Sequence, residues 1–356
     1  MATYDRIADL PLEIESCEFD GLELRFSEEF VRLSTLIKLR GGSHEGVGED
    51  VTYDALDHIA LRDAGPSEGL IGSFTLDSFS QWLEEVELWP SPAVRGTSVD
   101  YRRWAFESAA LDLALRQAGI GLAEAVGREA APVNFVVSMR LGAPGSEGPE
   151  RPDRLLRLLE RYPTTRFKLD PTNNWTEELV QTLVETARID TLDLKGLYTG
   201  TPVDVETDPE LYRMVIEAFP DAWIEDPDVN EETRPLLDPV ADRVTWDAPI
   251  HSVADIQALP WSPRMINVKP SRFGPVRRLF ETYDWCDENG VGAYGGGQVE
   301  LGVGRGQIQY LASLFHPDTP NDVAPGGYNL PEPGLGLPVS PLESQRSEVG
   351  FRWGAE

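Results

Sequence analysis

Five short apolar runs in the middle of the chain end in, or directly beside, a charged residue. The three central runs cover residues 191–193, 222–225 and 243–247, and each ends in an acid; residues 166–170 precede them and end in Asp170, and residues 265–269 follow and end in Lys269. Each run has the length of a buried strand, and most of the intervals between runs are long enough for a helix. This alternation predicts a parallel β/α barrel, in which the strand ends meet at one shared site.

The same alternation extends from residue 133 to residue 315. A first barrel strand is expected over residues 133–141 and a seventh over residues 291–294. The helices expected between the strands cover residues 152–161, 175–187, 209–219, 253–258, 275–289 and 307–315. We therefore expect a barrel domain over residues 131–339.

The first 130 residues follow a different pattern. Apolar and polar positions alternate, as they do in antiparallel strands, over residues 12–15, 22–26 and 30–39. Helical periodicity follows over residues 78–88, 101–118 and 122–126. Strands followed by helices predict a small α+β domain over residues 1–130, to which the segment 340–356 is able to return.

The net charge excludes one class of partner. The 356 residues include 61 acidic and 31 basic side chains, which gives a formal net charge of -30. Such a surface repels phosphate backbones, so we expect no nucleic-acid partner. The simplest interpretation of the charge is solubility.

The remaining composition indicates a protein of a reducing compartment. Cys17 and Cys286 are far apart and have no metal-type spacing, so they predict neither a disulfide framework nor a metal site. No apolar run approaches the roughly 18 residues needed to cross a bilayer. The first residues lack the pattern of a signal peptide. We therefore expect no membrane partner and a cytoplasmic location.

The charged strand ends suggest a metal site with acid/base groups beside it. Asp193, Glu225 and Asp247 would come together between Lys168 and Lys269. Carboxylate oxygens are the ligands that hard divalent cations prefer. Each acid taken alone is also explained by capping a loop or pairing with a lysine.

The ordered set of strand ends resembles the enolase superfamily, in its muconate cycloisomerase-like (mandelate racemase/muconate lactonizing enzyme) branch. Residues 105–115 are similar to the family's Ala-rich helix before the barrel, and Gly46-Val47-Gly48-Glu49 matches its Gly-x-Gly-Glu turn. The resemblance implies an α/β fold, namely a modified (β/α)7β TIM-type barrel with an N-terminal α+β capping domain.

The resemblance also implies roles for the strand-end residues. Asp193, Glu225 and Asp247 correspond to the ligands of one Mg2+ ion per chain. Lys168 corresponds to the first lysine of a strand-two Lys-x-Lys pair, and Lys269 to the strand-six lysine. A lysine close to other cations has a lowered pKa, which suits a general base. The alternative for Lys269 is an ion pair with Asp247 or Glu225.

Two residues depart from the family pattern. Asp170 stands where the second lysine of the pair is expected. It is a replacement base, an ion-pair partner of Lys168 or a sign that two-base chemistry has been lost, and we favour the ion pair. Lys195, two residues after Asp193, stands where the family often has asparagine. It is either an ion-pair partner within the acid cluster or a contact to a substrate carboxylate.

Further candidates lie on the loops that follow the strands. Arg140, Tyr294 and Gln298 are expected to contact substrate. A series of glycines from Gly295 to Gly306 leads into a predicted helix start, where backbone N–H groups would bind an anion. A flexible loop is the alternative interpretation of those glycines.

The resemblance implies a Mg2+-dependent lyase or isomerase that removes a proton next to the carboxylate of a small substrate, through a metal-stabilised enolate. With Asp170 in place of a lysine, a one-base reaction is expected, of the cycloisomerase or o-succinylbenzoate synthase kind. A dipeptide epimerase is one alternative, although the nearest match to its strand-eight Asp-x-Asp is His316-Pro317-Asp318. The other alternative is a non-catalytic, metal-containing binding protein. A homo-oligomer is left open.

Overall fold

The computed structural model describes residues 2–26, 30–143, 145–146, 148–330 and 332–354. Its first part contains two antiparallel sheets. One has the order β2-β3-β4, with bounds Ser16–Arg25, Val31–Gly41 and His44–Asp50. The other pairs β1 (Pro11–Ile14) with β5 (Gly72–Thr75). The helices of this part are α1 (Ala55–Ala64), α2 (Leu76–Trp82), α3 (Ser98–Ala118) and α4 (Leu122–Val126).

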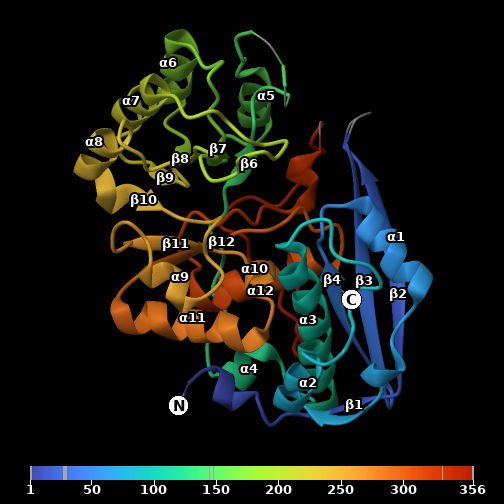
Figure 1. The fold of residues 1–356 in the computed structure, drawn as a ribbon. Helices are drawn as coiled ribbons and strands as arrows, with labels where there is room; N and C mark the ends of the chain where they lie inside the picture. The colour runs from blue at the N-terminus through green and yellow to red at the C-terminus, as the bar shows by residue number, and fades with distance from the viewer. Residues whose placement is uncertain (1, 27–29, 144, 147, 331, 355–356) are drawn as a thin grey trace.

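Helix α3 lies between the three-stranded sheet and the barrel (Figure 1). The Gly-x-Gly-Glu motif was expected at a turn, but it lies within strand β4, which packs directly on α3. A Cβ atom on Gly46 would lie 2.2 Å from the Ala109 carbonyl oxygen, and one on Gly48 would lie 2.0 Å from that of Ala105. Only glycine permits this close approach of strand and helix.

Helix α2 ends earlier than the predicted helix over residues 78–88. It begins after a capping box, in which the Thr75 hydroxyl accepts the Ser78 N–H, and it ends at Trp82. Glu84 and Glu85 follow the C-cap residue Leu83. Acidic side chains at a helix carboxyl end oppose the helix dipole, which explains the early termination.

The second part of the chain is a parallel barrel with helices outside it. Five strands pair in the order β10-β9-β8-β7-β6. They are β6 (Val137–Met139), β7 (Phe167–Leu169), β8 (Ile189–Asp193), β9 (Trp223–Glu225) and β10 (Val244–Thr245). Strands β11 (Met265–Val268) and β12 (Gly292–Gly295) form a parallel pair. The helices are α5 (Asp153–Arg161), α6 (Glu177–Thr186), α7 (Pro209–Ala218), α8 (Arg234–Leu237), α9 (Val253–Gln257), α10 (Pro270–Phe273), α11 (Val276–Asn289) and α12 (Val303–Phe315).

Short backbone links complete the barrel. The Asn267 N–H donates to the Trp246 carbonyl at 2.9 Å, which joins the β10 side to β11. Isolated parallel bridges join Asn321 to Phe135, before β6, and Asp322 to Gly296, after β12. Residues 321–322 therefore serve as the eighth barrel strand, which lies between the seventh strand, β12, and the first, β6.

The carboxyl-terminal segment lies against the first part of the chain. Gly350 forms a parallel bridge with Gly121, and the Phe351 N–H donates to the Asp112 carboxylate of α3 at 2.8 Å. Arg352 forms an ion pair with the same carboxylate at 2.8 Å, while the Phe351 ring is fully buried. Among the described residues, no helix is long and apolar enough to cross a membrane.

Candidate active site

The charged residues expected at the strand ends do gather inside the barrel. Asp193 and Glu225 are direct neighbours in the register of β8 and β9, and Lys168 lies on the adjoining strand β7. The side chains of both acids are 0% exposed and that of Lys168 is 2% exposed. Such burial of charge requires that the groups compensate one another or bind a cation.

Three carboxylates form one compact buried group. Asp193, Glu225 and Asp226 each offer an oxygen atom, and these three oxygens lie within 4.8 Å of one another. Asp226 follows β9 with a φ of 47°, and this left-handed conformation is strained for a residue other than glycine. Its carboxylate accepts the N–H groups of Asp247 at 2.8 Å and Ala248 at 2.9 Å. The sequence reading missed Asp226, although its position directly after Glu225 was a visible signal.

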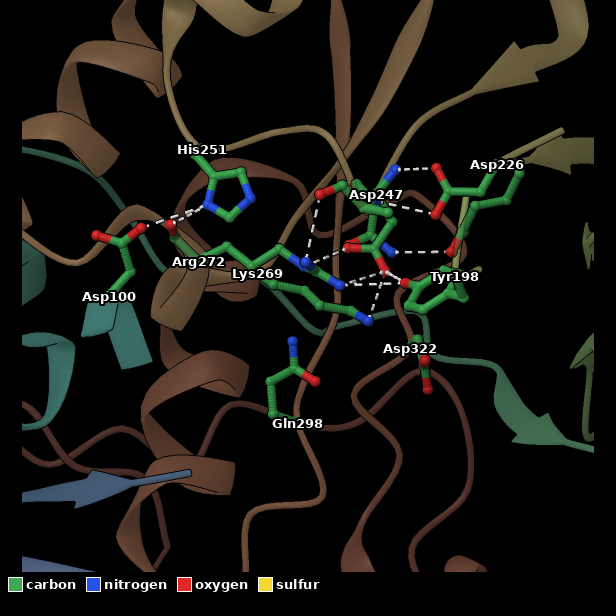
Figure 2. A network of polar contacts seen from close by, with 12 residues as sticks. Asp100, Tyr198, Asp226, Asp247, His251, Lys269, Arg272, Gln298 and Asp322 are labelled. Atoms are coloured by element: carbon green, nitrogen blue, oxygen red, sulfur yellow. Dashed lines mark hydrogen bonds and ion pairs between the residues drawn. The ribbon is translucent and has the colours of Figure 1, made fainter. Parts of the chain in front are cut away.

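Asp247, the predicted third ligand, does not belong to this group. Its carboxylate is ion-paired with Lys269 at 2.7 Å and with Arg272 at 3.0 Å, and it accepts the Tyr198 hydroxyl at 2.8 Å (Figure 2). Lys269, Arg272 and the Tyr198 hydroxyl hold the Asp247 carboxylate beside the group. The Asp247 N–H, which donates to Asp226, connects the residue to the group.

The two remaining lysines converge on Asp193. Lys168 contacts Glu225 and lies 3.0 Å from Asp193. Lys195 contacts the same Asp193 oxygen and lies 3.7 Å from Asp170. The favoured ion pair between Asp170 and Lys168 was therefore wrong: Lys168 turns toward the carboxylates of β8 and β9, and Lys195 is the partner of Asp170.

The pKa values of the three grouped acids are shifted in different directions. Burial alone would raise the pKa of Asp193, but Lys168 and Lys195 lower it below its ordinary value. Burial raises the pKa of Glu225 well above its ordinary value, and Lys168 offsets only part of this effect. Burial, together with Asp247 and Asp193, raises the pKa of Asp226 to about 7. With all three acids ionised, Asp193, Glu225 and Asp226 would carry three negative charges against the two positive charges of Lys168 and Lys195, and burial penalises that excess.

This arrangement fits a divalent cation. The available ligands are buried carboxylate oxygens, which suit Mg2+, and the charge imbalance favours a doubly charged ion. The Oδ1 atom of the adjoining Asp247 makes no hydrogen bond among the described residues, but the Arg272 guanidinium lies 3.0 Å from it as an ion pair.

Lys269 lies at the edge of this group, after β11. Its ammonium is paired with Asp247, which was the alternative interpretation of this residue. Burial lowers the pKa of Lys269, but Asp247 outweighs burial and leaves the pKa above its ordinary value. The lowered pKa predicted from neighbouring cations is thus wrong for this arrangement. Gly296 provides the space, because a Cβ atom there would lie 2.8 Å from Lys269 Cε.

The predicted substrate contacts have different surroundings. Tyr294 is fully buried and its hydroxyl donates to Glu225, so it supports that carboxylate. Gln298 accepts the Tyr53 hydroxyl at 2.9 Å and donates to the Tyr101 hydroxyl at 3.2 Å, so it joins the barrel to the first domain. Arg140 is different, because its buried Nε and one terminal nitrogen have no hydrogen-bond partner in the described part of the chain.

An acid of the eighth strand was also missed. Asp322 lies 3.9 Å from Lys168, at the strand end that bridges to Gly296. The predicted strand-eight match, His316-Pro317-Asp318, ends instead at Asp318, which is exposed and lines a recess of about 240 Å³ beside the amino end of β12. Because this strand is reduced to isolated bridges, no apolar run marked Asp322.

The glycine-rich loop does bind an anion, but the anion belongs to the chain itself. The Glu49 carboxylate accepts N–H groups of Leu301 at 2.7 Å, Gly302 at 2.9 Å and Gly304 at 3.0 Å. These amides surround the start of α12, where a negative charge is favoured. The Glu of the Gly-x-Gly-Glu motif thus connects the first domain to the barrel.

Comparison with known proteins agrees with this architecture. The family model "Domain of unknown function (DUF8230) C-terminal domain" matches residues 129–330, and the corresponding N-terminal domain model matches residues 5–125. An o-succinylbenzoate synthase of Bacillus subtilis (strain 168) is 27% identical over 229 residues, or 61% of this chain and 57% of that protein. An N-succinylamino acid racemase of Amycolatopsis sp is 30% identical over 102 residues, or 24% of this chain and 28% of that protein.

Solved structures cover more of the chain. A dipeptide epimerase from Methylococcus capsulatus, complexed with Mg ion, has a TM-score of 0.70 at 18% identity and covers 97% of this chain and 100% of its own. A muconate lactonizing enzyme from Pseudomonas putida has a TM-score of 0.62 at 18% identity, covering 87% and 88%. The predicted fold, a capping domain followed by an enolase-type barrel, is confirmed.

Proposed function

This chain belongs to the family described as domain of unknown function DUF8230 and has the fold of the enolase superfamily, and on that premise we propose that it is a Mg2+-dependent lyase or isomerase. It would remove a proton from the carbon next to the carboxylate of a small substrate. The observation that carries the proposal is the buried group of Asp193, Glu225 and Asp226, with the ammonium groups of Lys168 and Lys269 at its sides.

The metal would be held by Asp193 and Glu225, with Asp226 or the adjoining Asp247 as a third ligand. When bound, Mg2+ would supply a positive centre that binds the substrate carboxylate and stabilises negative charge developing beside it. Tyr294 keeps Glu225 oriented, because its hydroxyl donates a hydrogen bond to that carboxylate, and such bonds hold metal ligands in place.

Proton transfer is assigned to Lys269, which would accept the substrate proton as the neutral amine, so its ammonium, which Asp247 keeps charged, must first lose a proton. Its ammonium lies at the end of β11, and Asp247 fixes its direction at 2.7 Å. Lys168, on the opposite side of the group, would neutralise charge on the substrate oxygen. Asp170 is paired with Lys195, so in this proposal it positions that lysine and does not itself take a proton from the substrate. A one-base reaction from the Lys269 side is therefore favoured.

The substrate would carry at least one carboxylate, and Arg140 offers a place for a second anionic group. Its Nε and one terminal nitrogen are buried without a hydrogen-bond partner among the described residues, which is costly unless a ligand supplies an acceptor. A reaction of the o-succinylbenzoate synthase or cycloisomerase kind suits this arrangement. A dipeptide epimerase is the second candidate, because Asp322 at the eighth strand end offers a carboxylate to a substrate amine.

Hydrogen exchange tests the proposal. The protein would be incubated in D2O with a set of small mono- and dicarboxylates, with Mg2+ or with EDTA, and deuterium next to the carboxylate would be measured by NMR. We expect incorporation with Mg2+ that is lost in Lys269→Met and retained in Lys38→Met, a partly exposed lysine of the first domain that is paired with Asp20. A carboxylate that binds without any exchange would contradict the enzyme and favour a binding protein.

A further inference from the structure

Two ammonium groups contact one oxygen of the candidate metal site. Lys168 Nζ lies 3.0 Å from Asp193 Oδ2, and Lys195 Nζ contacts the same oxygen. A divalent cation bound through that oxygen would face two positive charges at contact distance, which is strongly unfavourable in a buried site. Metal binding through Oδ2 therefore requires the ammonium groups to move away.

Each lysine has a second acid just outside contact. Asp170 Oδ1 lies 3.7 Å from Lys195 Nζ, and Asp322 Oδ2 lies 3.9 Å from Lys168 Nζ. The Asp170 oxygen is buried and has no hydrogen-bond partner among the described residues. A buried acceptor without a donor is costly. Once the cation occupies Asp193, a shift of about 1 Å that brings the Lys195 ammonium into contact with Asp170 is therefore favoured.

The backbone around Lys195 holds its side chain over the site. Lys195 has a φ of 56°, a left-handed conformation that a lysine adopts only under constraint. The next residue must be glycine, because a Cβ atom on Gly196 would lie 2.3 Å from the Asp228 nitrogen. The chain thus turns sharply after Asp193, and the Lys195 ammonium lies between Asp193 and Asp170, 5.0 Å from the centre of the Tyr198 ring.

We propose that Asp170 and Asp322 receive these two ammonium groups when a divalent cation binds: Lys195 moves from Asp193 to Asp170, and Lys168 moves toward Asp322. Both lysines stay protonated, and no bond is made or broken. The inference rests on the proposed metal site and deepens it. It makes Asp170 and Lys195, the two departures from the family pattern, one functional pair of positioning residues.

A double-mutant cycle on Mg2+ affinity tests the pair. Isothermal calorimetry would compare the wild-type protein with Asp170→Asn, Lys195→Met and the double variant. We expect Asp170→Asn to weaken Mg2+ binding about tenfold when Lys195 is present and by less than about twofold when it is methionine. An equal loss of Mg2+ affinity in both backgrounds would reflect only the removal of a negative charge, and it would overturn the proposed movement of Lys195.

Control measurements separate the possible failures. Asp242→Asn removes the same charge from an exposed ion pair with Arg264 and should leave Mg2+ affinity unchanged. Absence of Mg2+ binding by the wild-type protein would contradict the proposed function itself, whereas binding without interaction between Asp170 and Lys195 contradicts only the shift. A crystal structure of the wild-type protein with Mg2+ avoids any folding defect: we expect Lys195 Nζ within about 3.2 Å of Asp170. An ammonium still in contact with Asp193 would overturn the proposal.

Discussion

The contact between Glu49 and the barrel loop gives the sharpest prediction about stability. One carboxylate oxygen accepts the Leu301 N–H and the Ser34 hydroxyl, and the other accepts the N–H groups of Gly302 and Gly304. Glu49→Gln keeps one oxygen and turns the other into an NH2 group, which faces two donors. Two charge-assisted hydrogen bonds are then lost at about 1.5 kcal/mol each, so the free energy of unfolding should fall by about 3 kcal/mol.

The assay is guanidinium denaturation at pH 7.5, followed by tryptophan fluorescence and far-UV circular dichroism. Glu45→Gln is the matched control, because Glu45 lies on the same strand but its ion pair with Arg40 is exposed to solvent. That change should stay within about 0.5 kcal/mol. A loss below about 1 kcal/mol for Glu49→Gln would refute the view that this carboxylate connects the two domains.

Three further predictions concern pH, the metal and the carboxyl-terminal segment. Burial lowers the pKa of His316 to about 4, so as the pH falls below about 6.5 the histidine is protonated in the unfolded chain but not in the folded one. Between pH 7 and pH 5, the free energy of unfolding measured with urea should therefore fall by about 2 kcal/mol more in the wild type than in His316→Gln. Equal falls in the two proteins would contradict this prediction. Tyr294→Phe removes the donor to Glu225 and should weaken Mg2+ binding about tenfold with the fold retained, a result that unchanged affinity in calorimetry would rule out. Arg352→Ala removes one cation from the buried Asp112 and should lower the unfolding free energy by about 1.5 kcal/mol; a loss under about 0.3 kcal/mol would show that this contact is not needed.

The sequence was sufficient for the fold and for the location of the site. Parallel barrel strands place their carboxyl ends together whatever the details of the loops, so acids at the ends of apolar runs had to meet. Asp193 and Glu225 do so because each is the last residue of its strand.

Residues beyond a strand end depend on backbone geometry that no periodicity reveals. Strand β10 ends at Thr245, so Asp247 lies two residues outside it, and Asp226 joins the group because its φ is positive. The pairing of Asp170 likewise depends on the left-handed conformation of Lys195. Asp322 was missed because its strand is too short to give an alternating pattern.

The central claim is that the buried carboxylates bind a divalent cation, and a calorimetric titration with Mg2+ tests it most directly. The wild-type protein, stripped with EDTA and dialysed, should bind one Mg2+ ion per chain, and Asp193→Asn should weaken that binding at least tenfold because it removes a ligand at the centre of the group. No binding by the wild type, or equal affinity in Asp193→Asn, would contradict the claim.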